Sequence, residues 1–163
     1  MGTDENQGVV TLRDVTADDL PVFFEHQLDP EAVWMAAFGA AGIKDWDAFT
    51  ARWTRALTDD TRVERTILWN DQVAGSVSSF TLFGDLAVGY WIGRDYWGKG
   101  IATRGLAAFL EIVTVRPLYA RAAKDNIGSR RVLEKCGFAV VGEDKGYAHV
   151  RGEEIEEVVL RLD

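Results

Sequence analysis

Two glycines in a short turn, Gly98 and Gly100, have the clearest chemical potential in the chain. They follow an aromatic, apolar run that is typical of a strand, and the apolar spacing of a helix begins directly after them. The first N–H groups of a helix have no internal partner, and the helix dipole places partial positive charge beside them. Glycines also leave room for a phosphate to approach these groups. The pattern predicts a site for a phosphorylated ligand, although a tight turn alone would explain the same glycines.

A second polar pair stands further along the chain, where Asn126 precedes another helix-like segment and Ser129 lies in its first turn. Asn is a common N-cap residue, because its side chain accepts a hydrogen bond from a free N–H of the first turn. Asn126 is therefore well explained as a cap and Ser129 as a polar residue of the turn. From these residues alone, a ligand contact and a purely structural role both remain open.

Taken together, the two segments resemble the GNAT superfamily of N-acetyltransferases. Segment 97–103 (WGKGIAT) is similar to its acetyl-coenzyme A loop, Gln/Arg-x-x-Gly-x-Gly/Ala, although Trp97 stands where Gln or Arg is usual. Segment 126–138 (NIGSRRVLEKCGF) is similar to its C-terminal signature. The pairing resembles the subgroup of ribosomal-protein N-terminal (RimJ/RimL-type) acetyltransferases. This resemblance covers roughly residues 8–162 and implies a GNAT-like fold and an acetyl-coenzyme A-dependent N-acetyltransferase.

The resemblance implies that a primary amine attacks the thioester carbonyl directly and expels coenzyme A as a thiolate. Many members protonate this thiolate with a tyrosine where this chain has Leu133, but in the resembling subgroup the serine at the Ser129 position is assigned that role. Ser129 is therefore the expected acid, and Asn126 is expected to orient the pantetheine arm. A backbone N–H near Trp91 and Ile92, where the resemblance places a bulge, is expected to stabilise the oxyanion.

The implied ligand contacts fall into two groups. The acceptor is expected to contact the first two helices, with Trp34, Phe38 and His26 as candidates, although aromatic side chains at such spacing are more often core. No metal site is expected. The implied cofactor-binding residues are Trp91, Ile92, Trp97, Gly98, Lys99, Gly100, Ile101, Ala102, Thr103, Asn126 and Arg131.

The general base and the acceptor are less defined. His26, Glu25, Asp29 and His149 are candidate bases, and a water chain to solvent would serve equally well. An α-amine, with a pKa of about 7.7–8.0, is partly neutral at pH 7, whereas a lysine amine near 10.4 is almost wholly charged. A protein N-terminal α-amine and a small-molecule amine are the two acceptors that we consider. The alternative to an enzyme is a non-catalytic acyl-coenzyme A-binding regulatory domain.

The elements that would position these residues form an α/β domain. We expect a mixed, largely antiparallel sheet of about seven strands, flanked by four or five helices. The fifth strand should run parallel to the fourth, because a helix connects them. The expected elements are strand 9–13, helices 17–27, 30–38 and 45–57, strands 62–69, 73–83 and 86–92, helix 101–115, strand 118–123, helix 127–136, and strands 138–142 and 154–162. Gly39 and Gly42 should end the second helix.

Composition limits the functional classes. At 163 residues and 47% hydrophobic, the chain can build one core, so we expect a flexible tail over 1–7 and a single acetyltransferase domain over 8–163. With 26 acidic against 18 basic residues, the net charge of −8 disfavours nucleic acid and favours amines. One cysteine, a polar and acidic start, and no apolar run of about 20 residues lead us to expect a cytoplasmic protein without a membrane contact, as a monomer or homodimer.

Overall fold

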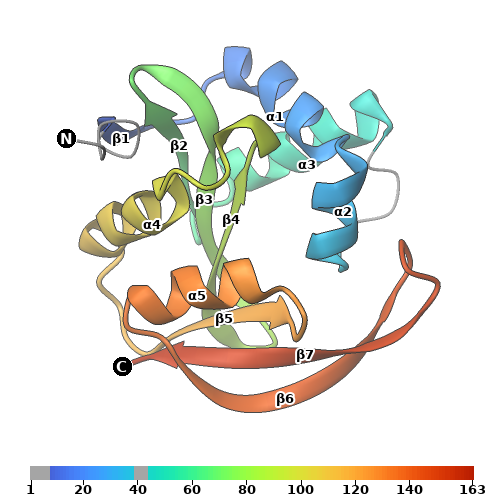
Figure 1. Cartoon of the computed structure of the whole chain (residues 1–163). Helices are drawn as coiled ribbons and strands as arrows, with labels where there is room; N and C mark the ends of the chain where they lie inside the picture. Colours follow the sequence, from blue (N-terminus) through green and yellow to red (C-terminus); the bar gives the residue numbers. More distant parts are fainter. Residues whose placement is uncertain (1–7, 39–43) are drawn as a thin grey trace.

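A computed structural model of the chain describes residues 8–38 and 44–163. Its centre is one seven-stranded sheet with the strand order β1-β2-β3-β4-β5-β7-β6 (Figure 1). The strands are β1 (Val10–Arg13), β2 (Val63–Trp69), β3 (Gln72–Leu82), β4 (Asp85–Ile92), β5 (Leu118–Ala123), β6 (Ala139–Ala148) and β7 (Glu153–Leu162). The helices are α1 (Leu20–Gln27), α2 (Pro30–Ala36), α3 (Trp46–Thr58), α4 (Ile101–Ile112) and α5 (Ile127–Lys135). The predicted mixed, largely antiparallel GNAT-like fold is confirmed.

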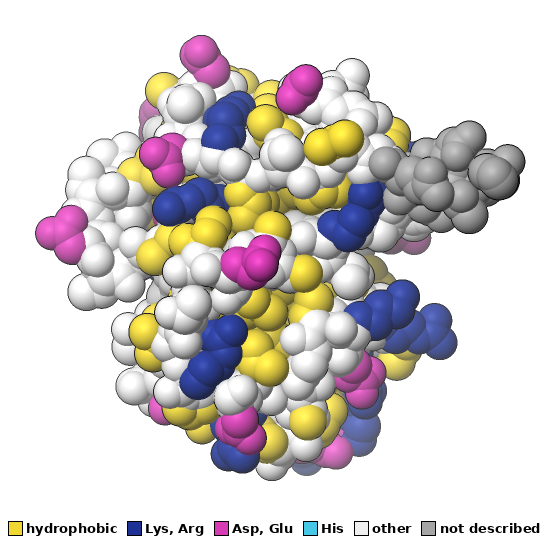
Figure 2. Space-filling model, turned by 90° about the vertical axis from the view of Figure 1, so that its left-hand side faces the viewer, with side chains coloured by type: hydrophobic (Ala, Val, Ile, Leu, Met, Phe, Trp, Pro, Cys, Tyr) yellow, Lys and Arg dark blue, Asp and Glu magenta, His cyan; other side chains and the backbone are white. Residues whose placement is uncertain are grey.

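Helices cover both faces of the sheet. α4 and α5 contact each other on one face, whereas α1 lies over β3 and β4 and α3 over β2 on the other. The main core fills the α4–α5 side, with Ile67, Leu106 and Phe109 fully buried. Figure 2 views the molecule from the α4 side, where hydrophobic side chains gather in a hollow across the middle of the face, between separate Lys and Arg side chains. None of the helices within the described part of the chain is long and apolar enough to cross a membrane.

A buried carboxylate fixes the start of α1 on the sheet. Asp19 is 2% exposed, and both of its oxygens accept hydrogen bonds from the Arg13 guanidinium, at 2.7 and 2.8 Å. It also accepts the Thr16 N–H at 2.9 Å and the Thr66 hydroxyl at 2.7 Å. Burial alone would raise the pKa of Asp19, but these hydrogen bonds and the charge of Arg13 lower it from 3.8 to about 2. Asp19 therefore joins the start of α1 to both β1 and β2.

The sheet opens between β4 and β5. β4 pairs with β3 without interruption, from Gly75↔Ile92 to Leu82↔Asp85. Its parallel pairing with β5 is limited to Ala87↔Tyr119. The two strands therefore part beyond Ala87, and the end of β4 has a free edge towards β5. The bulge expected near the end of β4 is not found in its ladder with β3; the separation from β5 creates the free edge instead.

The last hairpin is longer than expected. β6 continues past Gly142, through a register shift between Val140 and Gly142, and stays paired with β7 as far as Ala148. The predicted strand 138–142 was too short, because the charged segment 143–145 does not look like a strand in sequence. The segment is tolerated because β6 is the exposed edge of the sheet. The far end of the hairpin packs against Ala37, the C-cap of α2.

Other boundaries differ modestly from the expected ones. The first helix begins with a 3-10 turn at Ala17–Asp19, and α4 ends at Ile112 rather than 115. An unpredicted 3-10 turn, Arg94–Tyr96, separates β4 from the glycine loop. The expected tail over 1–7 and the expected helix stops at Gly39 and Gly42 lie outside the described residues.

Candidate active site

A cavity of about 830 Å³ lies where β4 and β5 separate, within the usual size range of small-molecule sites. Four lining residues are Lys or Arg, and none of the described residues that line it is Asp or Glu. This positive lining contrasts with the net charge of −8 of the whole chain. The lining comprises Ala32, Met35 and Ala36 of α2, Tyr90, Trp91 and Ile92 of β4, the segment 96–104, and Asn126, Gly128, Ser129, Arg131, Val132 and Lys135 of α5.

The glycine loop borders this cavity with a backbone that only glycine adopts easily. Gly98 has φ +77° and Gly100 has φ +74°, and Gly100 is the N-cap of α4. A Cβ at Gly98 would meet nothing within 4 Å, and a Cβ at Gly100 would meet only Arg104 Nε, at 4.0 Å. Both positions therefore face open space, and the free N–H groups of the first turn of α4 lie next to it. This arrangement suits a phosphate.

Side chains around the loop hold it rather than fill it. The Trp97 indole N–H donates to the Ile92 carbonyl at 2.9 Å, which returns this side chain to the end of β4. Arg104 donates to the Lys99 carbonyl at 3.1 Å and to the Gly8 carbonyl. Arg104 thus joins the loop to the start of the chain. Its contact with residue 8 spans nearly a hundred positions, so no local pattern in the sequence pointed to it.

Asn126 joins two elements across the cavity. Its side-chain oxygen accepts the Ser129 N–H at 3.2 Å, as an N-cap should, and its amide nitrogen donates to the Met35 carbonyl at 3.3 Å. The structural role of Asn126 is therefore present, and it extends to α2. Asn126 also lines the cavity, so contact with a pantetheine arm stays a prediction.

Ser129 forms a hydroxyl pair with a residue that the sequence analysis did not select. The Ser129 Oγ and the Tyr90 hydroxyl oxygen are 2.8 Å apart, and the Tyr90 hydroxyl also donates to the Ser129 carbonyl at 3.2 Å. Burial raises the pKa of Tyr90 to about 12, assisted by nearby Cys136 and opposed by the hydrogen bond with Ser129. Tyr90 therefore keeps its proton at neutral pH. A tyrosine is present beside Ser129 after all, supplied by β4 rather than by the Leu133 position.

A second cavity, of about 660 Å³, lies on the opposite face of the sheet beneath α3. Its floor includes Ser76 and Ser78 of β3 and Gly89 of β4. Tyr90 and Trp91 line both cavities, although their side chains point to opposite faces of the sheet. The two cavities therefore meet at the end of β4, where the edge of the strand is open.

The expected acceptor residues lie outside both cavities. Trp34 is 48% exposed and stacks under the Arg151 guanidinium at 5.1 Å, and Phe38 packs near Gly146 of the last hairpin. His26 packs against Gly93, and burial lowers the pKa of its imidazole. α2 turns its small face, Ala32 and Ala36 with Met35, towards the first cavity, so the expected contact of this helix with an acceptor stays a prediction.

The remaining candidate bases are also placed elsewhere. Asp29 caps α2 by accepting the Ala32 N–H at 2.9 Å and pairs with Arg94 at 3.2 Å. His149 stacks on Tyr147 in the last hairpin. Neither these two side chains nor Glu25 line either cavity. Among the described residues, none of the side chains that we considered as a base therefore lines a cavity.

Residues 10–139 match the family described as the acetyltransferase (GNAT) domain. Since the match spans most of the chain, the chain belongs to the GNAT acetyltransferase family, and the predicted resemblance is confirmed. The enzymes of this family use acetyl-coenzyme A as the acetyl donor, which also confirms the predicted cofactor.

Individual relatives agree with this assignment. Over 107 residues, 61% of this chain, it is 28% identical to the "Putative ribosomal N-acetyltransferase YdaF" of Bacillus subtilis (strain 168), and the match spans 58% of that protein's length. Spermidine N-acetyltransferase from Vibrio cholerae, solved with CoA and spermine, has a TM-score of 0.80 at 16% identity and 94% coverage of both chains. Mycobacterium smegmatis RimJ, solved with CoA-disulfide, has a TM-score of 0.77 at 22% identity, covering 95% of this chain and 82% of RimJ. At such identities the two structures show the shared fold.

All the residues predicted to bind the cofactor, and Ser129, line one cavity. Their individual roles stay predictions. Tyr90, Arg104 and the second cavity were missed. For Tyr90 a signal existed, because Tyr90 and Trp91 alternate along the strand and their side chains must face opposite sides of the sheet.

Proposed function

We propose that this chain transfers the acetyl group of acetyl-coenzyme A to a primary amine by direct attack on the thioester. The observation that carries the proposal is the cavity at the open end of β4, with four Lys or Arg residues, no acid among its described lining, and the two left-handed glycines. In an acidic protein, such a lining favours an anionic ligand. A diphosphate held by the loop and the first turn of α4 would direct the rest of the cofactor along β4.

The chemistry requires two contributions from the protein, an N–H group for the oxyanion and a hydroxyl group for the leaving thiolate. Beyond Ala87 the edge of β4 is unpaired towards β5, so its N–H groups are available to an oxyanion. The amine nitrogen forms the C–N bond, the carbonyl oxygen takes up the charge, and the nitrogen loses a proton to water. The C–S bond then breaks, and the leaving thiolate takes a proton from a hydroxyl group. The product is an amide and free coenzyme A.

The Ser129–Tyr90 pair is our candidate for that last proton. Ser129 faces the cavity and would donate directly, while the Tyr90 hydroxyl, 2.8 Å from Ser129 Oγ, would replace the proton and then regain one from water. Because the pKa of Tyr90 is raised to about 12, the phenol is protonated when the reaction begins.

The acceptor is a primary amine, either a protein N-terminal α-amine or a small-molecule amine. YdaF and RimJ support the first, and the spermidine N-acetyltransferase, solved with spermine, supports the second. The second cavity is the route that we assign to the acceptor, because it reaches Trp91 from the face opposite the cofactor cavity. The alternative is a non-catalytic acyl-coenzyme A-binding domain.

A thiol-release assay with acetyl-coenzyme A and a panel of amines tests the proposal. We expect turnover with at least one primary amine. Ser129→Ala should lower kcat by about 10²–10⁴-fold, the usual contribution of a general acid, with little change in acetyl-coenzyme A affinity. Tyr90→Phe should lower kcat by about tenfold, and the exposed Tyr147→Phe is the matched control.

The outcomes separate the alternatives. If Tyr90→Phe costs more than Ser129→Ala, the phenol is the direct donor. Full activity of Ser129→Ala would remove Ser129 from this role, and full activity of both variants would remove both hydroxyls. Tight binding of acetyl-coenzyme A without thiol release for any amine would establish the non-catalytic alternative.

A further inference from the structure

The second cavity carries an excess of positive charge that the cofactor does not explain. Its charged lining residues are Arg52, Arg55 and Arg62 against Asp59 and Glu64. It lies on the α3 face of the sheet, whereas the glycine loop and α4 belong to the other cavity. A cavity that received polyamines would be expected to show the opposite sign.

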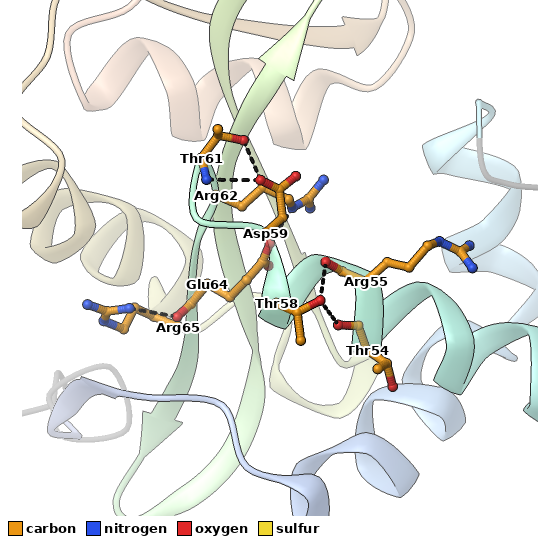
Figure 3. Close-up of polar contacts among 8 residues, drawn as sticks. All are labelled: Thr54, Arg55, Thr58, Asp59, Thr61, Arg62, Glu64 and Arg65. Atoms are coloured by element: carbon orange, nitrogen blue, oxygen red, sulfur yellow. Dashed lines mark hydrogen bonds and ion pairs between the residues drawn. The ribbon is translucent and has the colours of Figure 1, made fainter.

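Only part of this charge is neutralised inside the protein. Arg62 Nε is 2.8 Å from a Glu64 oxygen, and the Asp59 carboxylate accepts the Thr61 hydroxyl at 2.6 Å. Figure 3 shows Arg62 beside Glu64 and the Arg55 guanidinium directed away from both carboxylates. The pairing leaves Arg55 on the outer part of the wall without an acidic partner among the described residues.

Arg52 is the cation best placed to meet a ligand. It lies three positions after buried Phe49 and next to Trp53 on α3, so it belongs to the face of the helix that looks onto the cavity. Its side chain is half-buried, yet it makes no hydrogen bond or ion pair within residues 8–38 and 44–163. A guanidinium in such a place can bind a carboxylate or similar oxyanion through two parallel hydrogen bonds.

The floor of the cavity adds uncharged donors. Ser76 and Ser78 point to this face from β3, and their hydroxyls form no hydrogen bond with another described residue. Gly89, opposite Ser78 on β4, adds no side chain to the floor, and a Cβ there would lie 3.3 Å from the Phe80 ring. Free hydroxyls beneath an unpaired guanidinium are suited to an anionic group.

The sheet register sets the length of the ligand. Glu64, Ser78 and Gly89 stand opposite one another on three adjacent strands. With about 4.8 Å between strands, the β2 end of this row lies roughly 10 Å from β4. Glu64 is therefore too far from the β4 edge to deprotonate an attacking amine directly. A ligand whose amine reaches Trp91 would extend its other end over β3 and β2, beneath α3.

We infer that the acceptor is a small primary amine with a carboxylate or related oxyanion several bonds from the nitrogen, bound between Arg52 and the β3 serines. This inference rests on the proposed acetyl transfer and narrows its acceptor. The amine lies at the open edge of β4, and the anionic group lies beneath α3. Diamines are disfavoured, because their second ammonium group would meet arginines.

Three five-carbon amines test the charge preference: 5-aminopentanoate, pentylamine and 1,5-diaminopentane. They present the same amine on the same chain and end in a carboxylate, a methyl group and an ammonium group. We expect the order of kcat/KM to be aminopentanoate, then pentylamine, then the diamine. Arg52→Ala should raise KM for aminopentanoate by about 10- to 100-fold, as expected for a lost charge-assisted hydrogen bond, and leave pentylamine within about twofold.

Matched variants separate a local contact from a general charge effect. Arg161→Ala removes the same charge from the end of β7 and should change neither KM. Arg52→Lys should recover part of the aminopentanoate affinity, and Arg52→Glu should move the preference towards the diamine.

Each failure has a distinct reading. Equal kcat/KM for all three amines, or an Arg52→Ala effect that is the same for aminopentanoate and pentylamine, would overturn this inference while acetyl transfer stands. The amidated dipeptides Gly-Asp and Gly-Asn carry an N-terminal α-amine and differ in one carboxylate. If the enzyme distinguishes these two peptides but not the three five-carbon amines, the small-molecule assignment is wrong. If no amine is acetylated, the proposed function fails, and calorimetric titration of 5-aminopentanoate into wild type and Arg52→Ala still decides whether Arg52 binds it.

Discussion

Replacing Gly100 by alanine tests the claim that the glycine loop holds a diphosphate. A single methyl group is the smallest change that enters the open space before the loop. Gly100 has φ +74°, so an alanine there also strains the backbone. Gly84 provides a matched control, because it has φ +84° in the β3–β4 turn and its Cβ would likewise meet nothing within 4 Å. The two substitutions share the strain but only Gly100 borders the cavity.

The expected magnitudes follow from this comparison. A non-glycine residue in the left-handed region costs about 1–2 kcal/mol, and neither methyl group adds a steric clash within the described protein. Both variants should therefore lose a similar free energy of unfolding, equivalent to a fall in Tm of about 2–8 °C. At Gly100 the methyl group also stands where a phosphate would approach the first turn of α4. Loss of one charge-assisted hydrogen bond there should weaken acetyl-coenzyme A binding by about 10- to 100-fold.

Thermal unfolding and calorimetric titration with acetyl-coenzyme A measure the two effects separately. We expect equal losses of Tm and weaker cofactor binding for Gly100→Ala alone; Gly98→Ala should behave like Gly100→Ala. If Gly100→Ala binds acetyl-coenzyme A as tightly as wild type, the loop does not contact the diphosphate. If Gly84→Ala weakens binding equally, strain and not contact is responsible.

Asp19→Asn should lower the free energy of unfolding at pH 7 by about 2.5 kcal/mol, because the pKa of this buried carboxyl falls from 3.8 to about 2 on folding. A carboxyl whose pKa is lowered on folding stabilises the fold above its unfolded pKa, near pH 4, and this contribution disappears as the pH falls from 4 towards 2. The free energies of unfolding of wild type and variant, measured in urea, should therefore converge over that range. A difference between them that does not change with pH would contradict the reasoning. Asn126→Ala should lower the free energy of unfolding by about 0.5–2 kcal/mol through loss of the α5 cap, and by more if the hydrogen bond to the Met35 carbonyl also stabilises the fold. An unchanged Kd for acetyl-coenzyme A in that variant would exclude a pantetheine contact.

The parts of the site that the sequence predicted are the local ones. The strand, glycine turn and helix around residues 97–103 are encoded within a few neighbouring positions, as is the cap at Asn126. The pairing of Tyr90 with Ser129 depends on how α5 lies over β4, and the length of β6 depends on its place at the sheet edge. The sequence predicted a helix in the region of α2 but not which of its sides faces the cavity. Trp34 lies against Arg151 of the last hairpin, a contact with a residue far away in sequence.

The alternation of β4 would let one strand serve both of the ligands that we propose. Tyr90 points towards α5 and the cofactor cavity, while Trp91 belongs to the opposite face, beneath which the second cavity begins. β5 pairs with β4 only at Ala87, so beyond that point no neighbouring strand separates the two faces. A carbonyl held at this edge is open to the cofactor from one side and to an amine from the other. Cys136, the one cysteine of the chain, lines neither cavity, and burial raises the pKa of its thiol. A covalent acetyl-cysteine would therefore lie away from both ligands, which supports direct transfer from thioester to amine.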